Sequence, residues 1–408
     1  MRTLQNAYDV AVVGGSIAGC ASAILFAKMG HKVVVFEQKT LDDEQHYKRL
    51  CTHFVQPSAV PVLDELGLQH LRQDRFAIQT RACMVTDGGV IDHPAPYGEH
   101  GYALNLERRV FDPALRSAVR EHGISFVDGC EVNQVERTEQ GWVLHYDEMA
   151  ASVSARLLIA ADGRQSRLAK QLDNTVDLRS NDRAAVFGYF KGIPVPELSR
   201  SLFILHEGEM GFLYPLIGGR TLLSVYISKQ RAEQWRESGQ EASLLAYFAT
   251  LPGVPDLSGA KLDSAILGYK DYPNQLRQPV HESVAFVGDA VTSLDPMSGV
   301  GCGFALCAAH LLAKAFAGRT LEASQIDAGL EEYALQYRKV ITPHVAGICA
   351  DSLIGKDLAS QQKSYQIISG NPDVSAAYLA LTGRLILPAE FQRAFLRGTI
   401  LQRQKDAR

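Results

Sequence analysis

The sequence lacks an excess of charge of either sign. Its 408 residues include 41 lysines and arginines and 45 aspartates and glutamates, which gives a formal net charge of −4. Proteins whose main partner is a nucleic acid usually carry a clustered basic excess, and this chain has no long basic block. We therefore expect no nucleic-acid partner.

Cysteines are few and irregularly placed. The seven lie at positions 20, 51, 83, 130, 302, 307 and 349. They lack the paired spacing of a zinc site, so we expect no bound metal. Scattered cysteines are typical of small buried residues in a reducing compartment, not of a disulfide framework. The sequence therefore predicts a cytoplasmic protein.

One uncharged run, Val10–Ala27, is similar in composition to a signal peptide or a membrane span. Two glycines and a serine interrupt it after four apolar residues, and its two halves differ in character. The first half has the pattern of a buried strand, and the second that of a helix of small residues. We interpret the run as part of a soluble domain and expect no stable membrane insertion.

The N-terminal segment alternates strand and helix. An apolar strand at Tyr8–Val13, a helix at Ile17–Met29 and a second strand at Lys32–Glu37 form a βαβ pattern. This pattern predicts a parallel sheet with right-handed crossovers. The chain is too long for one ordinary domain, and its 46% hydrophobic content excludes a disordered protein.

The central segment has a different character. Alternating strands at 184–190, 212–215 and 221–227, with Gly218 and Gly219 between the last two, predict an antiparallel sheet inserted into the first domain. A buried strand at 284–287 returns to that domain. The expected helices are 57–66, 105–122, 232–251 and 299–317, and the chain beyond residue 325 has a helical pattern.

A glycine-rich turn joins the first strand to the first helix. Gly14 suits a tight turn, and Gly19 suits close packing of helix on strand. The helix N-terminus between them favours a pyrophosphate. Glu37 ends the next strand 18 residues after Gly19, where a carboxylate accepts from ribose hydroxyls. The turn predicts a dinucleotide site, and a plain βα turn is the alternative.

Two later strands each end in an aspartate–glycine turn. The strand Leu157–Ala161 leads into Asp162-Gly163, and the strand 284–287 leads into Gly288-Asp289 and then a loop through Pro296 to Gly301. Asp289 is suited to accept from a polyol such as ribityl. The N–H groups of Gly299–Gly301 are suited to a partial negative charge on a flavin ring. A turn aspartate without a ligand remains the alternative for each.

Taken in this order, the three segments resemble the FAD-dependent monooxygenases of the aromatic-hydroxylase type. That family combines an N-terminal Gly-x-Gly-x-x-Gly, a central Asp-Gly and a later Gly-Asp with a Pro–Gly loop. The segment from Arg108 to Leu115 is similar to the family's Arg-x-x-Leu helix start. The resemblance covers about residues 8–345.

The resemblance implies an α/β fold: a Rossmann-type FAD-binding domain with an inserted antiparallel β-sheet substrate domain and a C-terminal helical segment. We expect the FAD-binding domain at residues 1–75, 105–175 and 275–345. The substrate domain is expected at 76–104 and 176–274, and the helical segment at 346–408.

The resemblance also implies the cofactors FAD and NAD(P)H and a set of site residues. Pro296 would lie beside the flavin, and Arg49 would assist flavin movement or NAD(P)H binding. The candidate cofactor-binding residues are Gly14, Ser16, Ala18, Gly19, Glu37, Arg108, Asp162, Asp289, Gly299, Val300 and Gly301.

The substrate site is expected under the inserted sheet. Phe212, Tyr214 and Tyr226 alternate along its strands, and His53 is a candidate polar contact. A position in the core is the alternative for each aromatic residue, and a structural role is the alternative for the histidine.

Several positions depart from the family pattern, among them Val291-Thr292 where many members have Ala-His and Gln38 where a basic residue is common. Ser16 replaces the middle glycine, and Val300 stands where many members have glutamine. The halogenases of this fold carry a Trp-x-Trp-x-Ile-Pro segment, and here Gly211–Pro215 keeps only an apolar run ending in proline.

The activity that the resemblance implies is oxygenation with NAD(P)H and O2 through a flavin C4a-hydroperoxide. The product would be a hydroxylated or epoxidised small aromatic or polyketide-like metabolite. The alternatives are a flavin-dependent reductase of the geranylgeranyl-reductase type and a flavin-dependent halogenase. We expect a small-molecule substrate and a monomer or homodimer.

Overall fold

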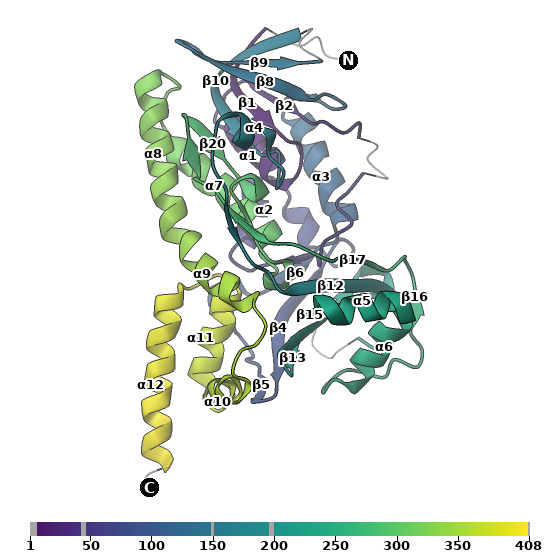
Figure 1. The fold of residues 1–408 in the computed structure, drawn as a ribbon. Coiled ribbons are helices and arrows are strands. Elements are labelled where there is room, and N and C mark those ends of the chain that lie inside the picture. Colours follow the sequence, from purple (N-terminus) through teal and green to yellow (C-terminus); the bar gives the residue numbers. More distant parts are fainter. Residues whose placement is uncertain (1–5, 42–45, 148–150, 196–199, 407–408) are drawn as a thin grey trace.

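The computed structural model describes residues 6–41, 46–147, 151–195 and 200–406, with side chains up to residue 400. The outer ends of the first and last predicted segments, residues 1–5 and 407–408, lie outside this description. Within it, two large sheets and a small one form the framework, and helices cover them (Figure 1). This agrees with the predicted α/β class.

The first sheet has the strand order β19-β20-β10-β1-β2-β7. Its central neighbours β20, β10, β1, β2 and β7 pair in parallel, as the βαβ pattern predicts. Strands β8 and β9 extend β10 as an antiparallel meander. The strands are β1 Ala7–Val13, β2 Val33–Phe36, β7 Ser125–Val127, β8 Val132–Thr138, β9 Gly141–Tyr146, β10 Ala151–Ala160, β19 Val280–His281 and β20 Val284–Phe286.

Helices pack on this sheet because its central strands are apolar on both faces. Helix α1 is buried along almost its whole length and packs against α7 and α3. The helices of this part are α1 Ile17–Lys28, α2 Val60–Glu65, α3 Arg108–Glu121, α4 Arg167–Gln171, α7 Gly301–Phe316 and α8 Ala323–Val340.

The second sheet has the strand order β16-β12-β15-β14-β13-β4-β6-β3, with β5 and β17 on its sides. It is not purely antiparallel as predicted, because β13 pairs with β4 in parallel. Its strands are β3 Phe54–Val55, β4 Ile78–Thr86, β5 Gly89–Ile91, β6 Ala103–Asn105, β12 Arg183–Lys191, β13 Arg200–His206, β14 Glu209–Leu216, β15 Arg220–Ser228, β16 Lys261–Leu262 and β17 Leu267–Tyr269.

A small third sheet has the order β11-β18-β21. Its strands are β11 Asp177–Arg179, β18 Asn274–Leu276 and β21 Thr292–Ser293. Short 3-10 turns complete the connections, at Gln69–Arg72, Gly98–His100, Ile217–Gly219, Gly288–Ala290 and Pro296–Ser298.

The second sheet lies between two groups of helices (Figure 1). On one face, Leu244 and Phe248 of α6 join its core. On the other face, Ile368, Val374 and Leu379 of the C-terminal helices do so. The helices are α5 Lys229–Ser238, α6 Gln240–Thr250, α9 Thr342–Asp351, α10 Leu358–Ser369, α11 Pro372–Thr382 and α12 Pro388–Asp406.

Four predicted helices have wrong bounds. The helix expected over 105–122 begins at Arg108, because the residues up to Asn105 pair as strand β6. The helix expected over 232–251 is two helices, divided at Gly239 with φ of 104°. The helix expected over 299–317 begins at Gly301, because Gly299 is left-handed. The helix expected over 57–66 is shorter, at Val60–Glu65.

No helix in the described part of the chain has both the length and the apolar character needed to cross a membrane. The uncharged run of the first domain is accounted for by β1 and α1.

The contact between α1 and α7 carries a stability prediction. Phe26 of α1 is fully buried and its ring lies 5.4 Å from that of Phe316 in α7. We expect Phe26→Ala to lower the free energy of unfolding by about 3–5 kcal/mol, since it removes buried apolar surface and leaves a cavity. Urea denaturation measures this. The exposed Leu178 is the control, and Leu178→Ala should change stability by less than about 0.5 kcal/mol. A loss for Phe26→Ala as small as that of the control would contradict the packing described.

Candidate cofactor and substrate site

A cavity of about 1070 Å³ lies where the edges of the two large sheets meet. Its size is at the upper end of the range for small-molecule and cofactor sites. The N-terminus of α1, the end of β2, the segment 46–54, the start of α3 and the loop before α7 form one part of its wall. The aromatic side chains of β12, β15 and β17 form another part.

The turn before α1 is closely packed. Gly14 has φ of 110°, its N–H donates to the carbonyl of Phe36 at 2.7 Å, and a Cβ there would lie 2.2 Å from the carbonyl oxygen of Ala161. A Cβ on Gly19 would lie 1.8 Å from the carbonyl oxygen of Gly14. Both positions therefore require glycine, as predicted, and Gly19 serves packing without lining the described cavity wall.

The N-terminus of α1 opens onto the cavity. Ser16 and Ala18 line the cavity, and the first turn of the helix contains no acidic residue. The first N–H groups of a helix have no partner within it and carry partial positive charge, so they favour an anion. This end of the cavity is suited to a pyrophosphate.

Glu37 is held in place by the backbone. Its carboxylate accepts from the N–H of Gly15 at 2.8 Å and from the N–H of Lys39 at 3.0 Å, one to each oxygen. Each oxygen keeps a further lone pair, and the residue lines the cavity. The carboxylate is therefore fixed where it is able to accept from the hydroxyls of a sugar.

Arg108 connects the start of α3 to the glycine-rich turn. Its guanidinium pairs with both oxygens of Asp112, at 2.5 and 3.0 Å, and donates to the Ser16 hydroxyl at 3.1 Å. The arginine and aspartate are buried with side-chain exposures of 3% and 8%. The (i, i+4) spacing of this pair is visible in the sequence, but Asp112 is not among the predicted residues.

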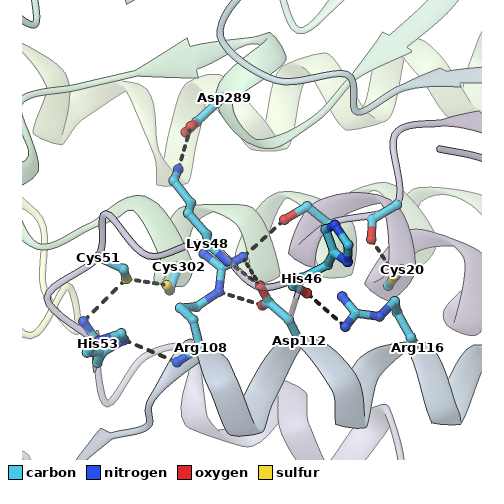
Figure 2. A network of polar contacts seen from close by, with 12 residues as sticks. Cys20, His46, Lys48, Cys51, His53, Arg108, Asp112, Arg116, Asp289 and Cys302 are labelled. Carbon is cyan, nitrogen blue, oxygen red and sulfur yellow. Dashed lines mark hydrogen bonds and ion pairs between the residues drawn. The ribbon is translucent and has the colours of Figure 1, made fainter. Parts of the chain in front are cut away.

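Asp289 pairs with Lys48 across the cavity. The ammonium of Lys48 lies 3.3 Å from a carboxylate oxygen of Asp289, and the Lys48 N–H donates to Asp112 at 3.0 Å (Figure 2). The negative charge of Asp289 raises the pKa of Lys48. Lys48 lies in an irregular segment without a pattern that would have predicted its position.

Asp162 caps helix α4. One carboxylate oxygen accepts from the N–H groups of Arg167 and Leu168, at 2.8 and 3.1 Å. The other oxygen is buried and has no hydrogen-bond partner in the described part of the chain. Burial raises the pKa of this carboxyl group. The residue lines the cavity, and its second oxygen is a buried acceptor without a partner in the described structure.

The loop before α7 lines the cavity. Gly299 is left-handed with φ of 65°, and its carbonyl accepts from the amide of Gln56. A Cβ on Gly301 would meet nothing within 4 Å. The four predicted residues Pro296, Gly299, Val300 and Gly301 all line the cavity.

Aromatic side chains line the part of the cavity formed by the second sheet. They are Phe54, Phe187, Tyr226 and Tyr269, and Tyr272 joins them from the loop after β17. The Tyr269 hydroxyl donates to the buried Asp295 at 3.1 Å, so its polar end is satisfied away from the apolar face.

The other predicted substrate residues lie elsewhere. Phe212 and Tyr214 are fully buried and stack at 5.3 Å behind the cavity, although Tyr226 does line it. His53 is also buried: its Nδ1 accepts from the N–H of Arg108 at 3.1 Å, and its Nε2 lies 2.5 Å from the Tyr189 hydroxyl. These bonds favour a structural role. Arg49 is exposed at the cavity, with its guanidinium 6.0 Å from the Tyr47 ring.

The family described as FAD binding domain matches residues 7–346, and the chain belongs to this family. It is therefore a flavoprotein of the class whose relatives include FAD-dependent oxidoreductases and monooxygenases, as the resemblance implied.

Relatives with different activities have similar, low sequence identities to this chain. The chain is 24% identical over 387 residues to digeranylgeranylglycerophospholipid reductase 2 of Methanothermobacter thermautotrophicus, covering 92% of each chain. It is 22% identical over 341 residues to tryptophan 2-halogenase of Chondromyces crocatus, covering 79% of this chain and 63% of the relative. The structure of p-nitrophenol 4-monooxygenase PnpA from Pseudomonas putida is similar with a TM-score of 0.72 at 18% identity, covering 94% of this chain and all of PnpA. This structural likeness shows the shared fold.

The cavity fits the cofactor of the family. The glycines leave room for a ligand at a helix N-terminus, Glu37 is held ready to accept, and one oxygen of Asp162 is buried without a partner in the described structure. These three features match the phosphate, the sugar and the polar edges of a dinucleotide.

A change at Gly19 tests this fit. We expect Gly19→Ala to weaken FAD binding by about tenfold or more, equivalent to about 1.4 kcal/mol, because the new Cβ forces α1 away from the turn. The ratio of FAD to protein and the dissociation constant measure this. Gly347→Ala is the control, since a Cβ there meets nothing within 4 Å. Equal FAD affinity in the two variants would contradict the role of the turn.

A second prediction concerns Asp289. We expect Asp289→Ala to reduce the free energy of FAD binding by about 1.5–3 kcal/mol, because the substitution removes a charged acceptor and leaves Lys48 without its partner. The measurement is the flavin that stays bound after gel filtration. Asp327→Ala on the exposed surface of α8 is the matched control. A yellow Asp289→Ala protein with the FAD content of the control would refute the predicted placement.

Proposed function

We propose that the chain is a FAD-dependent monooxygenase that uses NAD(P)H and O2 to hydroxylate or epoxidise a small aromatic or polyketide-like metabolite. The observation that carries the proposal is that one cavity is lined both by the elements suited to a dinucleotide and by a group of aromatic side chains. A planar apolar substrate packs favourably on such rings.

The residues of the first domain would hold FAD. The α1 N-terminus suits the pyrophosphate, Glu37 the ribose hydroxyls, and Asp289 the hydroxyls of the ribityl chain. The backbone of Pro296–Gly301 and the N-terminus of α7 would lie beside the flavin ring. When bound, FAD supplies the redox and oxygen chemistry, and the protein binds, orients and excludes water.

The second sheet supports this role by restricting water. Phe187 and Tyr226 are buried in the core of this sheet, Tyr269 packs against that core, and all three line the cavity. An apolar wall of this kind helps to exclude water, and exclusion of water limits side reactions of reactive intermediates. The reaction needs no side-chain nucleophile, because the cofactor carries the chemistry.

The proposal includes NAD(P)H as the electron donor. Exposed cationic side chains of Lys39, Arg49 and Arg167 lie at the same cavity. Guanidinium and ammonium groups bind phosphates well, so this rim is suited to a pyridine dinucleotide.

The reductase alternative has its own support. The digeranylgeranylglycerophospholipid reductase of M. thermautotrophicus aligns with nearly the whole chain, and an apolar cavity also suits a prenyl chain.

The halogenase alternative is weaker. Gly211–Pro215 keeps only the final proline of the halogenase segment and lies in strand β14, where Phe212 and Tyr214 face the core.

Oxygen consumption distinguishes these activities. We expect a substrate from a panel of aromatic and polyketide metabolites to accelerate NAD(P)H oxidation, with equal O2 uptake and a product that is heavier by one oxygen atom. Mass spectrometry with 18O2 identifies the source of that atom. Prenyl lipids are then incubated with the enzyme and NAD(P)H without oxygen, and mass spectrometry detects any product that has gained two hydrogens. Reduction of a prenyl substrate under these conditions, without any oxygenated product in air, would overturn the proposal in favour of a reductase.

A further inference from the structure

Two cysteine side chains meet on the cavity wall. The sulfurs of Cys51 and Cys302 lie 3.7 Å apart, although the residues are 251 positions apart in the chain (Figure 2). Cys51 follows Lys48 and Arg49 in the irregular segment after residue 45, and Cys302 lies in the first turn of α7. Neither residue has a role in the proposed oxygenation.

Both cysteines line the cavity, so a small solute that enters it reaches them. Cys302 is buried with 6% exposure, and Cys51 is partly exposed. The Cys51 sulfur also accepts from the N–H of His53 at 3.3 Å (Figure 2). It therefore has one donor directed at it, the His53 N–H, and a sulfur–sulfur contact with Cys302 in which either thiol is able to donate.

The surroundings distinguish the two sulfurs. The contact with Cys302, the nearby His53 side chain and the positive charge of Arg108 hold the pKa of Cys51 well below its ordinary value, against the opposing effect of burial. The same contact raises the pKa of Cys302, which keeps its proton. The surroundings thus favour the thiolate form of Cys51 and the thiol form of Cys302. Thiol–disulfide chemistry uses such a pair of one thiolate and one thiol.

The surroundings of the other thiols in this region do not favour the thiolate form. Cys20 donates to the carbonyl of Gly15 at 3.2 Å, and burial raises its pKa to about 12. Burial also raises the pKa of Cys307, five residues beyond Cys302, and that of Cys130, which lines the cavity, each to about 12. Reactivity with an oxidant is therefore expected at one thiol of this region, Cys51.

We propose that Cys51 and Cys302 form a thiol–disulfide redox site on the cavity wall, in which Cys51 attacks a peroxide and Cys302 resolves the oxidised product. The Cys51 thiolate attacks one oxygen of hydrogen peroxide, the O–O bond breaks, and hydroxide leaves and takes a proton from solvent. Cys51 is then a sulfenic acid. The Cys302 sulfur displaces its hydroxyl group, which leaves as water with the Cys302 proton. Two thiols and one peroxide give one disulfide and two water molecules.

The geometry allows the bond to close. A disulfide requires sulfurs about 2.05 Å apart, so the pair must approach by less than 2 Å. Cys302 is fixed by its helix, whereas Cys51 belongs to a segment without regular structure. The disulfide would tie this segment, including Lys48 and Arg49, to the start of α7. Oxidation would therefore fix two neighbouring parts of the cavity wall to each other.

Counting thiols tests the proposal on the FAD-bound protein. One equivalent of hydrogen peroxide should remove two of the seven thiols that react with a thiol reagent after denaturation. Peptide mapping should find the peptide of Cys51 joined to that of Cys302, and dithiothreitol should restore both thiols. The readout does not depend on turnover or on a substrate, so it is separate from the test of the proposed function.

Single variants assign the two roles. Cys302→Ser should accumulate a sulfenic acid at Cys51 that dimedone labels, and Cys51→Ser should lose no thiol at the same dose. Cys302→Ala is the second variant if serine disturbs the buried position. Cys307→Ser is the control on the same helix, and its Cys51–Cys302 disulfide should form as in the wild type.

The pH dependence supplies an independent measurement. Because the pKa of Cys51 is lowered, its thiolate persists at pH values where an ordinary thiol is protonated. The rate of peroxide consumption should therefore stay high as the pH falls below 8 and decline only through the lowered pKa. The proposal is overturned if all thiols remain after treatment, if the disulfide joins other cysteines, or if Cys302→Ser and Cys51→Ser respond alike.

Discussion

The site depends on one close approach, that of helix α1 to the ends of β1 and β10. Gly14 lies against the Ala161 carbonyl, and Gly19 lies against the Gly14 carbonyl, with no room for a Cβ at either position. This approach directs the helix N-terminus into the cavity and brings the β10 turn, with Asp162, beside it. The phosphate end of the cavity is therefore a consequence of backbone packing, and side chains have little part in it.

The buried pair of Arg108 and Asp112 explains how the turn accommodates Ser16. A serine at the middle position would place a hydroxyl near the expected phosphate, but that hydroxyl accepts from Arg108. Because both charges of the pair are buried and bonded to each other, removing one partner would leave the other unpaired at high cost. The departure from the family pattern is thus compensated within this chain.

Much of the fold and of the cofactor wall could be predicted from sequence, because local patterns determine them. The βαβ alternation gives the parallel sheet, and glycines that require special backbone angles mark the turns. The substrate wall could not be predicted in the same way. Phe212 and Tyr214 alternate as a strand should, but Ile368, Val374 and Leu379 of the C-terminal helices join the core on their face. Alternation identifies the two faces of a strand, and only tertiary packing decides which part of a face stays open.

The segment 46–53 was equally unpredictable, because it has no regular structure. Its contact across the cavity is the Lys48–Asp289 pair, whose side chains are 48% and 25% exposed. A partly exposed pair of this kind contributes about 0–1 kcal/mol. The opposite wall is built from helix N-termini and sheet ends packed at van der Waals limits. The segment is also held by hydrogen bonds from the Lys48 N–H to Asp112 and between His53 and Tyr189, and it carries the sulfur of Cys51. A covalent bond from that sulfur to α7 would hold the segment far more strongly than the ion pair does.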